Sequence, residues 1–268
     1  MFTKYSAKPI KASFSAKDGI KFLVTAGLIV WFMFVSTGRL EYNWQWYRIP
    51  KYLFTFIDGS FVAGPLLDGI LVTLKITAMS VVISSIFGLV TALFRLSDSF
   101  AARSLSRVYM ELVRNTPLLV QIFFIYFVIS PVLGFSRFTS AVLALSLFEG
   151  AYASEIFRAG ILSIYKGQWE AAYSIGLNRW NTYRHVILPQ AIRHMLPPLA
   201  SQAISLIKDS ALVSTIAIYD LTMQGQQIIA ETYMVFELWF TIAAIYLLMT
   251  ATLSITVNIM EKRLTVEA

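Results

Sequence analysis

Long apolar runs separated by short polar stretches dominate the pattern along the chain. A helix that crosses a membrane needs about 20 mostly apolar residues. The stretches that approach or exceed this length are residues 22–38, 66–94, 117–133, 138–161, 190–218 and 236–260. They show little alternation with a period of two, so helices explain their length better than the strands of a barrel do. The pattern therefore predicts an all-α integral membrane protein with about six transmembrane helices.

Prolines complicate two of these predicted spans. A helix that starts as early as Leu105 could lead into the third span, which opens on Thr116-Pro117. The fifth span contains Pro197-Pro198. Because proline removes a backbone donor and clashes with the preceding turn, we expect this pair to interrupt the fifth helix.

Composition agrees with a membrane protein and argues against several other classes. Hydrophobic residues make up 57% of the chain and charged residues 14%, against about a quarter charged in soluble domains. The net charge is +7, but the basic residues lie between apolar spans instead of forming one patch, so we expect no nucleic-acid partner. Cysteine is absent, and the only histidines are His185 and His194. We therefore expect no disulfide and no metal site.

The distribution of basic residues between the spans predicts the orientation in the membrane. Lysine and arginine in short loops favour the cytoplasmic side. One side carries Lys4, Lys8, Lys11, Lys17, Lys21, Arg95, Arg103, Arg107, Lys166, Arg179, Arg184, Lys262 and Arg263. The other side is poorer in basic residues, although Arg39, Arg48 and Lys51 are exceptions. Both termini and the loop at 163–189 are thus expected in the cytoplasm.

The first 65 residues precede the main group of spans. Residues 1–21 form a basic tail, and the helix at 22–38 is long for a signal peptide and lacks a clear A-x-A site, so we expect it to be retained. Residues 39–65 carry aromatic side chains of the kind found at membrane–water interfaces. An interfacial segment on the outer face and an ordinary aromatic-rich loop both account for them. The last eight residues, 261–268, form a cytoplasmic tail.

A polar insert at residues 170–189 lies between the fourth and fifth spans. Apolar and small residues recur there at steps of three and four, as a weak stripe on a helix: Trp169, Ala172, Tyr173, Gly176, Trp180 and Tyr183. Glycine inside a helix costs about 1 kcal/mol, so Gly176 predicts two short helices with a bend. Pro189 suits the first turn of the next span. An amphipathic loop on lipid headgroups and a docking surface for a cytoplasmic partner both remain open.

The same insert resembles the EAA loop of ABC importer permeases. That pattern reads EAA, three residues, Gly, nine residues, then I-x-L-P, and the chain matches its spacing with Val186 in the isoleucine position. The segments LLDGILVTLKIT, YMELVRNTPLLVQIFFIY, GAYASEIFRAGI, KGQWEAA and LPQAIRHMLPPLASQAISLIKDSAL resemble the polar amino-acid branch of this family. The resemblance covers about residues 66–260. The chain departs from the family pattern at Asn115, where glycine is common, and at Ser210-Ala211, where Thr-Ser is common.

The resemblance implies a fold, partners and a coupling site. The fold is a five-helix type I permease core with one extra N-terminal helix and short cytoplasmic coupling helices. The partners are a dimer of ATP-binding cassette subunits, a second permease (identical or homologous), a periplasmic solute-binding protein and the lipid bilayer of the bacterial inner membrane. The chain has no G-x-x-x-x-G-K-[ST] loop, so ATP and Mg would bind the partner subunit. The residues implied to contact that subunit are Glu170, Ala171, Ala172, Gly176, Val186, Leu188 and Pro189.

Ionisable residues inside the predicted spans are candidates for substrate contact. A charge at mid-bilayer costs about 2.5–3.5 kcal/mol on insertion scales, and Glu149, Lys208 and Asp209 lie within the fourth and fifth spans. Glu149 could hold a substrate ammonium, could pair with Lys75 or Lys208, or could be a protonated acid. Lys208 and Asp209 point about 100° apart on a helix, so they are poor partners for each other. Glu155 instead has Arg158 three residues on and is expected to form a local pair.

Further residues complete the predicted substrate site. Gln121 could line the cavity or bridge two helices, and Tyr152 and Ser210 lie in the same segments as the charged candidates. No paired metal ligands and no nucleophile–base arrangement are found, so we expect a transport subunit and not an enzyme. We predict a permease that imports a polar amino acid by alternating access. The alternative is a secondary transporter or channel for small zwitterionic solutes without an ATPase partner. The sequence does not identify the amino acid.

Overall fold

A computed structural model of the chain describes residues 16–38 and 42–266. The chain divides into two units, residues 1–44 and 45–268. The first unit contains helix α1 (Ala16–Gly38) and a pair of edge-on aromatic rings, Tyr42 and Trp44, whose centroids are 5.1 Å apart. The expected basic tail falls largely on residues 1–15, which lie outside the described residues.

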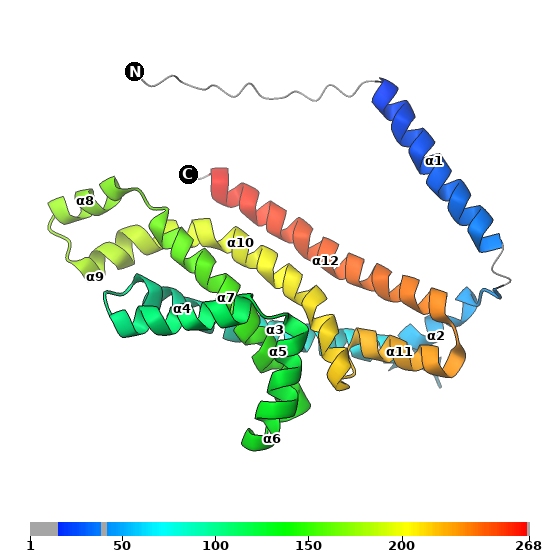
Figure 1. Ribbon diagram of the computed structural model, residues 1–268. Helices are drawn as coiled ribbons and strands as arrows, with labels where there is room; N and C mark the ends of the chain where they lie inside the picture. Colours follow the sequence, from blue (N-terminus) through cyan, green and yellow to red (C-terminus); the bar gives the residue numbers. More distant parts are fainter. Residues whose placement is uncertain (1–15, 39–41, 267–268) are drawn as a thin grey trace. The chain divides into compact units, whose positions relative to one another are not determined.

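The second unit is almost entirely helical (Figure 1). It begins with the 3-10 turn η1 (Trp46–Arg48), α2 (Pro50–Leu53), and strands β1 (Phe54–Ile57) and β2 (Ser60–Ala63). The middle holds α3 (Pro65–Leu96), α4 (Phe100–Arg114), α5 (Leu118–Phe123), the π-helix η2 (Phe124–Ile129), α6 (Ser130–Leu133) and α7 (Arg137–Leu162). The remaining elements are α8 (Lys166–Ser174), α9 (Arg179–Thr182), the π-helix η3 (Tyr183–Ile187), α10 (Leu188–Asp209), the 3-10 helix η4 (Ser210–Ile216), α11 (Leu221–Thr232) and α12 (Val235–Val266).

Three helices of the described residues are long and apolar enough to cross a membrane: α3, α7 and α12. A fourth crossing is counted if α4 and the α5–α6 segment, which are bent by 107°, form one broken span. The apolar part of α1 is shorter, and α10, with 22 residues, is long enough but not apolar enough to be counted. The prediction of a multi-helix membrane protein is therefore confirmed, whereas the count of six helices is not.

The α3 helix buries small polar residues and exposes large apolar residues, which is the reverse of a helix in a soluble protein. Besides Leu66 and Ile76, its buried face carries small, mostly polar residues, many at steps of three and four: Thr73, Thr77, Ser80, Ser84, Gly88 and Thr91. Its exposed face carries large apolar residues such as Leu71, Val82 and Ile86. Small residues let helix backbones approach closely inside a membrane, where lipid solvates the apolar side chains. A Cβ added to Gly88 would lie 2.7 Å from the Cβ of Ala153 on α7, so the two helices cross in close contact.

Packing of the other helices against α3 and α7 positions the rest of the unit. The α10 helix lies against α7 and α12, and α11 lies against α3. The central core joins α3, α5, α7, α10 and η4 through residues such as Ile76, Ile122, Leu145, Leu206 and Val213. The α11 helix is capped by Asp220, whose side chain accepts the backbone N–H of Met223 at 2.9 Å. These contacts give the second unit one continuous helical framework.

The prediction that Pro197-Pro198 interrupts the fifth helix is wrong. Both prolines lie inside α10, which is helical from Leu188 to Asp209. Arg193 and His194, the residues whose carbonyls lose their i+4 donors, are exposed, so the missing hydrogen bonds do not leave buried groups unpaired. Since α9, η3 and α10 follow one another without a gap, the backbone is helical from Arg179 to Asp209. The break comes later, at η4, which ends at the left-handed residue Ala217 with φ of 55°.

The helix expected to run from about Leu105 into the third span is instead a separate helix, α4. The α4 helix begins at Phe100 and ends at Arg114, and the chain then turns by 107° into α5. Pro117 cannot donate to the preceding turn and disfavours a helical conformation at the residue before it, so the helix stops there. Asn115 caps the end, because its side-chain amide donates to the carbonyl of Glu111 at 2.8 Å.

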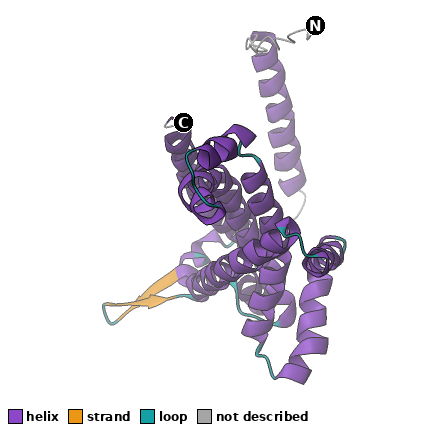
Figure 2. Cartoon of the chain, turned by 90° about the vertical axis from the view of Figure 1, so that its left-hand side faces the viewer, coloured by secondary structure: helices purple, strands orange, loops and turns teal. Residues whose placement is uncertain are grey.

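A short β-hairpin departs from the all-α prediction. Strands β1 and β2 pair antiparallel, with Phe54 opposite Ala63 and Ile57 opposite Ser60. The hairpin projects at the edge of the second unit (Figure 2). Phe54 stacks on Phe61 at 6.0 Å between centroids, and Phe56 contacts both rings edge-on at 6.1 and 6.0 Å. It lies within residues 39–65, where the sequence indicated only an interfacial segment or a loop.

Candidate functional site

The polar insert forms a helical hairpin, α8–turn–α9, as Gly176 predicted. Gly176 follows α8 in the left-handed conformation, with φ of +84°. Its N–H donates to the carbonyl of Tyr173 at 3.0 Å, and the N–H of Leu177 donates to that of Ala172 at 3.1 Å. This pair of bonds is the Schellman motif, which favours glycine at the left-handed residue. Asn178 then caps α9 by accepting the N–H of Asn181 at 2.9 Å.

One half of the predicted apolar stripe holds the hairpin onto the membrane helices. Trp169 packs edge-on against Tyr183 with centroids 4.9 Å apart. Ala172 is 3% exposed, and Trp169 and Tyr183 pack against a cluster that includes Ile164 and Ile187. The hairpin is therefore fixed to the ends of α7 and α10 by a small apolar core.

Two further apolar residues of the stripe, Tyr173 and Trp180, are uncovered, and so is Ile175 at the C-terminal end of α8. Tyr173, Ile175 and Trp180 are 47%, 77% and 70% exposed, and we call these three residues the hairpin surface. Exposed apolar patches rimmed by polar residues mark protein or membrane contacts. Lipid headgroups and a protein partner both remain compatible with this surface on geometry alone.

The predicted coupling residues lie along this hairpin and the start of α10. Glu170 and Ala171 are exposed on α8, Ala172 is buried, and Gly176 forms the turn. Val186 packs partly against the apolar core, and Leu188 and Pro189 are exposed in the first turn of α10. The structure thus brings these residues into one region, from α8 to the first turn of α10.

Pro189 lies in the first turn of α10, as predicted. This turn continues directly from the π-helix η3. In the wider turn of η3 the N–H of Leu188 donates to the carbonyl of Tyr183, five residues earlier. The side-chain amide of Gln190 donates to the carbonyl of Val186 at 2.8 Å. The π-turn and this side-chain bond accommodate the N–H that proline lacks.

Glu149 is the most deeply buried of the predicted substrate residues. It lies near the middle of α7 and is 4% exposed. Among the described residues its Oε1 atom has no hydrogen-bond partner, and no ion pair with Lys75 or Lys208 is formed. Lys75 instead lies over the ring of Phe138, with its Nζ 5.4 Å from the ring centroid. A buried carboxylate oxygen without a partner is costly unless a ligand, water or proton satisfies it.

The end of α10 supplies a second group of predicted residues. Asp209 is partly buried and lies within electrostatic range of Glu149. Lys208 is exposed, as expected for a neighbour that points elsewhere on the helix. Ser210 is fully buried and donates to the carbonyl of Ile207 at 2.7 Å, so its hydroxyl is used within the chain. Two carboxylates therefore approach one another where α7 and α10 pack.

Gln121 and Tyr152 contact residues other than Glu149. The amide of Gln121 donates to the carbonyls of Val113 and Thr116, both at 2.8 Å, and so bridges the bend between α4 and α5. Tyr152 packs on Phe148 and under the guanidinium of Arg114, 5.7 Å from its ring centroid. Gln121 thus bridges the bend, and it also lines an apolar pocket of about 610 Å³, so it fits both roles that the sequence left open. Tyr152 faces a different pocket.

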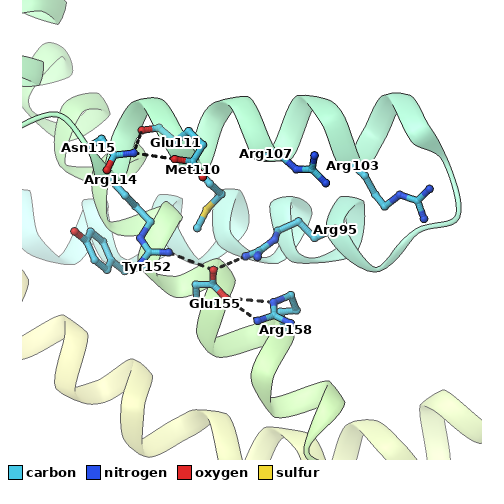
Figure 3. Close-up of a pocket in the computed structure, with 10 residues that line it drawn as sticks. All are labelled: Arg95, Arg103, Arg107, Met110, Glu111, Arg114, Asn115, Tyr152, Glu155 and Arg158. Atoms are coloured by element: carbon cyan, nitrogen blue, oxygen red, sulfur yellow. Dashed lines mark hydrogen bonds and ion pairs between the residues drawn. The ribbon is translucent and has the colours of Figure 1, made fainter.

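That pocket has a volume of about 590 Å³ and is lined by charged side chains of α3, α4 and α7 (Figure 3). Its lining residues are Arg95, Arg103, Arg107, Met110, Glu111, Arg114, Asn115, Tyr152, Glu155 and Arg158; we call it the arginine pocket. The predicted pair of Glu155 and Arg158 is confirmed at 3.1 Å. Arg95 and Arg114 reach the same carboxylate at 2.7 and 3.3 Å.

The sequence did not predict the arginine pocket, although one signal was present. Arg103, Arg107 and Arg114 recur at helical spacing and lie on one face of α4. The contributions of α3 and α7 depend on how the helices pack and have no local signal. Among the residues that the structure describes, no group of three His, Cys, Asp or Glu side chains could hold a metal ion.

The chain is similar to a known family and to known proteins. Residues 84–266 match the family described as binding-protein-dependent transport system inner membrane component. The glutamine transport system permease protein GlnP of Escherichia coli (strain K12) is 40% identical over 202 residues, which cover 74% of this chain and 92% of that protein. The L-cystine transport system permease protein TcyB of Bacillus subtilis (strain 168) is 42% identical over 203 residues, covering 75% and 87%.

Solved structures also match. A crystal structure of an amino acid ABC transporter with histidines has a chain that is 40% identical, with a TM-score of 0.70 and coverage of 74% of this chain and 94% of that one. An inward-facing MetNI methionine ABC transporter is 19% identical with a TM-score of 0.64, covering 75% and 96%, and is similar in fold.

Proposed function

The chain belongs to the family of binding-protein-dependent transport system inner membrane components, and from that premise we propose that it is the permease through which an ABC importer takes up a polar amino acid. The relatives named for glutamine and L-cystine transport support this class of substrate. The substrate itself is one that carries an ammonium and a carboxylate.

The hairpin surface is the observation that carries the proposal. It presents three exposed apolar side chains on a hairpin that is fixed to the ends of α7 and α10. A dimer of ATP-binding cassette subunits, which bind ATP and Mg, would cover this surface and move the hairpin. Since this hairpin also contains the EAA pattern, the geometry and the sequence favour the same partner.

Glu149 is the proposed contact for the substrate ammonium. Its buried Oε1 atom is free of protein donors within the described residues, and Asp209 adds negative charge from α10. An ammonium group placed there would satisfy the free oxygen and offset the cost of two neighbouring carboxylates. Lys208 and Ser210, which flank Asp209 in the chain, complete the proposed site. Gln121 supports the bend between α4 and α5, and Tyr152 lines the arginine pocket.

The proposed topology has the transport domain at residues 66–260, with the coupling loop at 163–189. In it, α1 and α10 complete six crossings with α3, α7, α12 and the bent α4–α6 segment. Residues 39–65, with the β-hairpin, lie on the periplasmic side, and both termini lie in the cytoplasm of the bacterial cell. A second permease, identical or homologous, completes the path, and a periplasmic solute-binding protein delivers the substrate.

Transport in this proposal proceeds by alternating access. Closure of the ATP-binding subunits pulls the two hairpins together, and the continuous helix from Arg179 to Asp209 carries that movement to the region of Glu149. Substrate would enter when the site opens to the periplasm and leave when it opens to the cytoplasm. The energy comes from ATP hydrolysis on the partner subunits.

The test is a reconstitution of the chain with its ATP-binding subunit and its solute-binding protein. We expect one or a few polar amino acids to stimulate ATP hydrolysis and drive uptake into vesicles. Ile175→Asp, which places a charge on the hairpin surface, should reduce co-purification of the ATP-binding subunit by at least about tenfold. The matched control is Val132→Asp, at an exposed position of α6 (81% exposed) outside the hairpin.

Two outcomes would reject the proposal. Retention of the ATP-binding subunit by Ile175→Asp to the same degree as by the control would remove the role of the hairpin surface. Amino-acid uptake that continues without any ATP-binding subunit would instead favour a secondary transporter or channel.

A further inference from the structure

The arginine pocket carries more positive charge than the protein itself neutralises. Five arginines and two glutamates line it, which leaves an excess of three positive charges. The carboxylate of Glu155 is fully engaged, with Arg95 and Arg114 on Oε1 and Arg158 on Oε2. The second glutamate, Glu111, accepts the amide of Asn115 at 2.9 Å.

Two of the arginines are left with open donors. Arg103 makes one long contact, 3.4 Å to the carbonyl of Ser97. Within the described part of the chain, Arg107 forms no ion pair and no hydrogen bond. The two side chains lie on the same side of α4, beyond the Glu155 cluster (Figure 3). Like charges four residues apart on a helix are unfavourable, so an anion between these guanidinium groups would relieve their repulsion.

The chemistry of the pocket selects the kind of anion. Paired guanidinium groups are suited to bidentate contacts with the oxygens of a phosphate group. A volume of about 590 Å³ accommodates a headgroup or a free anion of similar size. The shared chemistry is therefore that of a phosphate oxyanion, either on a lipid or in solution.

The position of the pocket favours a lipid as the source. Arg95 lies in the last turn of α3, and Arg103 lies in the first turn of α4, so the pocket opens where the apolar helices end. On the other side of α4 the exposed residues are large and apolar: Leu105, Val108 and Leu112. A helix with a basic face and an apolar face lies at the level of lipid headgroups. Basic pockets between membrane helices bind anionic headgroups.

We propose that the arginine pocket binds the headgroup phosphate of an anionic phospholipid, held by Arg103 and Arg107 with the Glu155 cluster as its rigid floor. This site is separate from the proposed contact of substrate with Glu149, and it does not depend on which side of the membrane the pocket faces. The bound lipid would join α3, α4 and α7 at the place where α4 is otherwise exposed.

The experiment measures lipid binding by the purified full chain in neutral detergent. The probes are dihexanoyl phosphatidylglycerol, dihexanoyl phosphatidylcholine, inorganic phosphate and glutamine. We expect the anionic lipid to bind at least about tenfold more tightly than the zwitterionic lipid. Arg103→Gln with Arg107→Gln should weaken its binding about thirtyfold, about fivefold for each arginine.

The matched control removes the same charge elsewhere. Arg184→Gln with Arg193→Gln changes two exposed arginines of η3 and α10 outside the pocket, and binding should change by less than about twofold. The melting temperature of the pocket variant without lipid should equal or exceed that of the unchanged chain, because the like-charge pair is gone. This second measurement separates lost binding from lost folding.

Several results would overturn the proposal. Equal affinity for the two lipids would remove the requirement for net negative charge. Equal weakening by the control variant would assign the effect to overall charge. Displacement of the anionic lipid by inorganic phosphate at the same concentration would assign the pocket to a soluble anion, and displacement by glutamine would assign it to the transported substrate.

Discussion

Glu149 and Glu155 lie six residues apart on α7 and have opposite surroundings. Glu149 is 4% exposed, and its Oε1 atom has no partner in the described structure. The side chain of Glu155 is 31% exposed and contacts three arginines within 3.3 Å. The two carboxylates are about 9 Å apart along one helix.

The difference arises from what packs against α7 at each level. Near Glu149, α7 contacts the small-residue face of α3, whose hydroxyl groups donate to backbone carbonyls: Thr77 to Thr73, Ser80 to Val142 and Ser84 to Val81. Near Glu155, the end of α3 and the side of α4 place guanidinium groups around the carboxylate. The carboxylate of Glu149 is thus available to a ligand, whereas the carboxylate of Glu155 is engaged in ion pairs within the protein. Variants that separate transport from stability can test this contrast.

The largest expected effect is on transport by Glu149→Gln. The amide removes the negative charge that would hold an ammonium, and a charge-assisted hydrogen bond contributes about 1.5–3 kcal/mol. We expect ATP-driven uptake into vesicles to fall by up to about a hundredfold, while the free energy of unfolding stays the same or rises because an unpaired buried charge is gone. Unchanged uptake with unchanged dependence on substrate would leave Glu149 a structural residue.

The next effect is on stability at the crossing of α3 and α7, between the two carboxylates. Gly88→Leu would place a side chain where a Cβ already lies 2.7 Å from Ala153. We expect the free energy of unfolding to fall by about 2 kcal/mol, measured by denaturant titration in detergent micelles. Ala78→Leu, at an exposed position of the same helix, is the control. Equal stability of the two variants would contradict the close packing of these helices.

A smaller effect is expected at the coupling hairpin, beyond both carboxylates. Gly176→Ala puts a Cβ on a residue with φ of +84°, which costs about 1 kcal/mol. The hairpin should loosen, so that uptake per ATP hydrolysed falls by about fivefold while substrate affinity is kept. Ser174→Ala is the control within α8. Full coupling in Gly176→Ala would show that the rigid turn is dispensable.

The smallest effect is expected for Glu155→Gln. Each of its ion pairs is partly exposed, and exposed pairs contribute about 0–1 kcal/mol. We expect a loss of about 1 kcal/mol in stability that shrinks at high salt, with uptake reduced by less than about twofold. A greater loss of uptake than in Glu149→Gln would reverse the roles of the two carboxylates.

Features set by neighbouring residues in the chain could be predicted from the sequence. The helical hairpin followed from the spacing of Trp169, Ala172 and Tyr183 and from Gly176, because helix periodicity and a left-handed turn are local signals. The pair of Glu155 and Arg158 followed from a spacing of three residues. The apolar runs predicted a membrane protein for the same reason.

Features that depend on contacts between distant segments could not be predicted. Arg95 reaches Glu155 across 60 residues of chain, and nothing in either segment specifies the other. The continuity of α10 through its two prolines depends on the exposure of the carbonyls they leave unpaired. The lack of a partner for the Oε1 atom of Glu149 among the described residues depends on the helices around it, so the sequence alone left its alternatives open.

The uninterrupted helix from Arg179 to Asp209 has a mechanical consequence. Thirty-one residues at 1.5 Å each make a rod about 45 Å long. Ile187, Ala191 and Met195 pack against the end of α7, and Leu206 is buried in the central core, so the rod is supported along its length. A push on the hairpin at one end would then reach Asp209 at the other end as a movement of the whole rod. The stiffness of this rod would then determine how much of the hairpin's movement reaches Asp209.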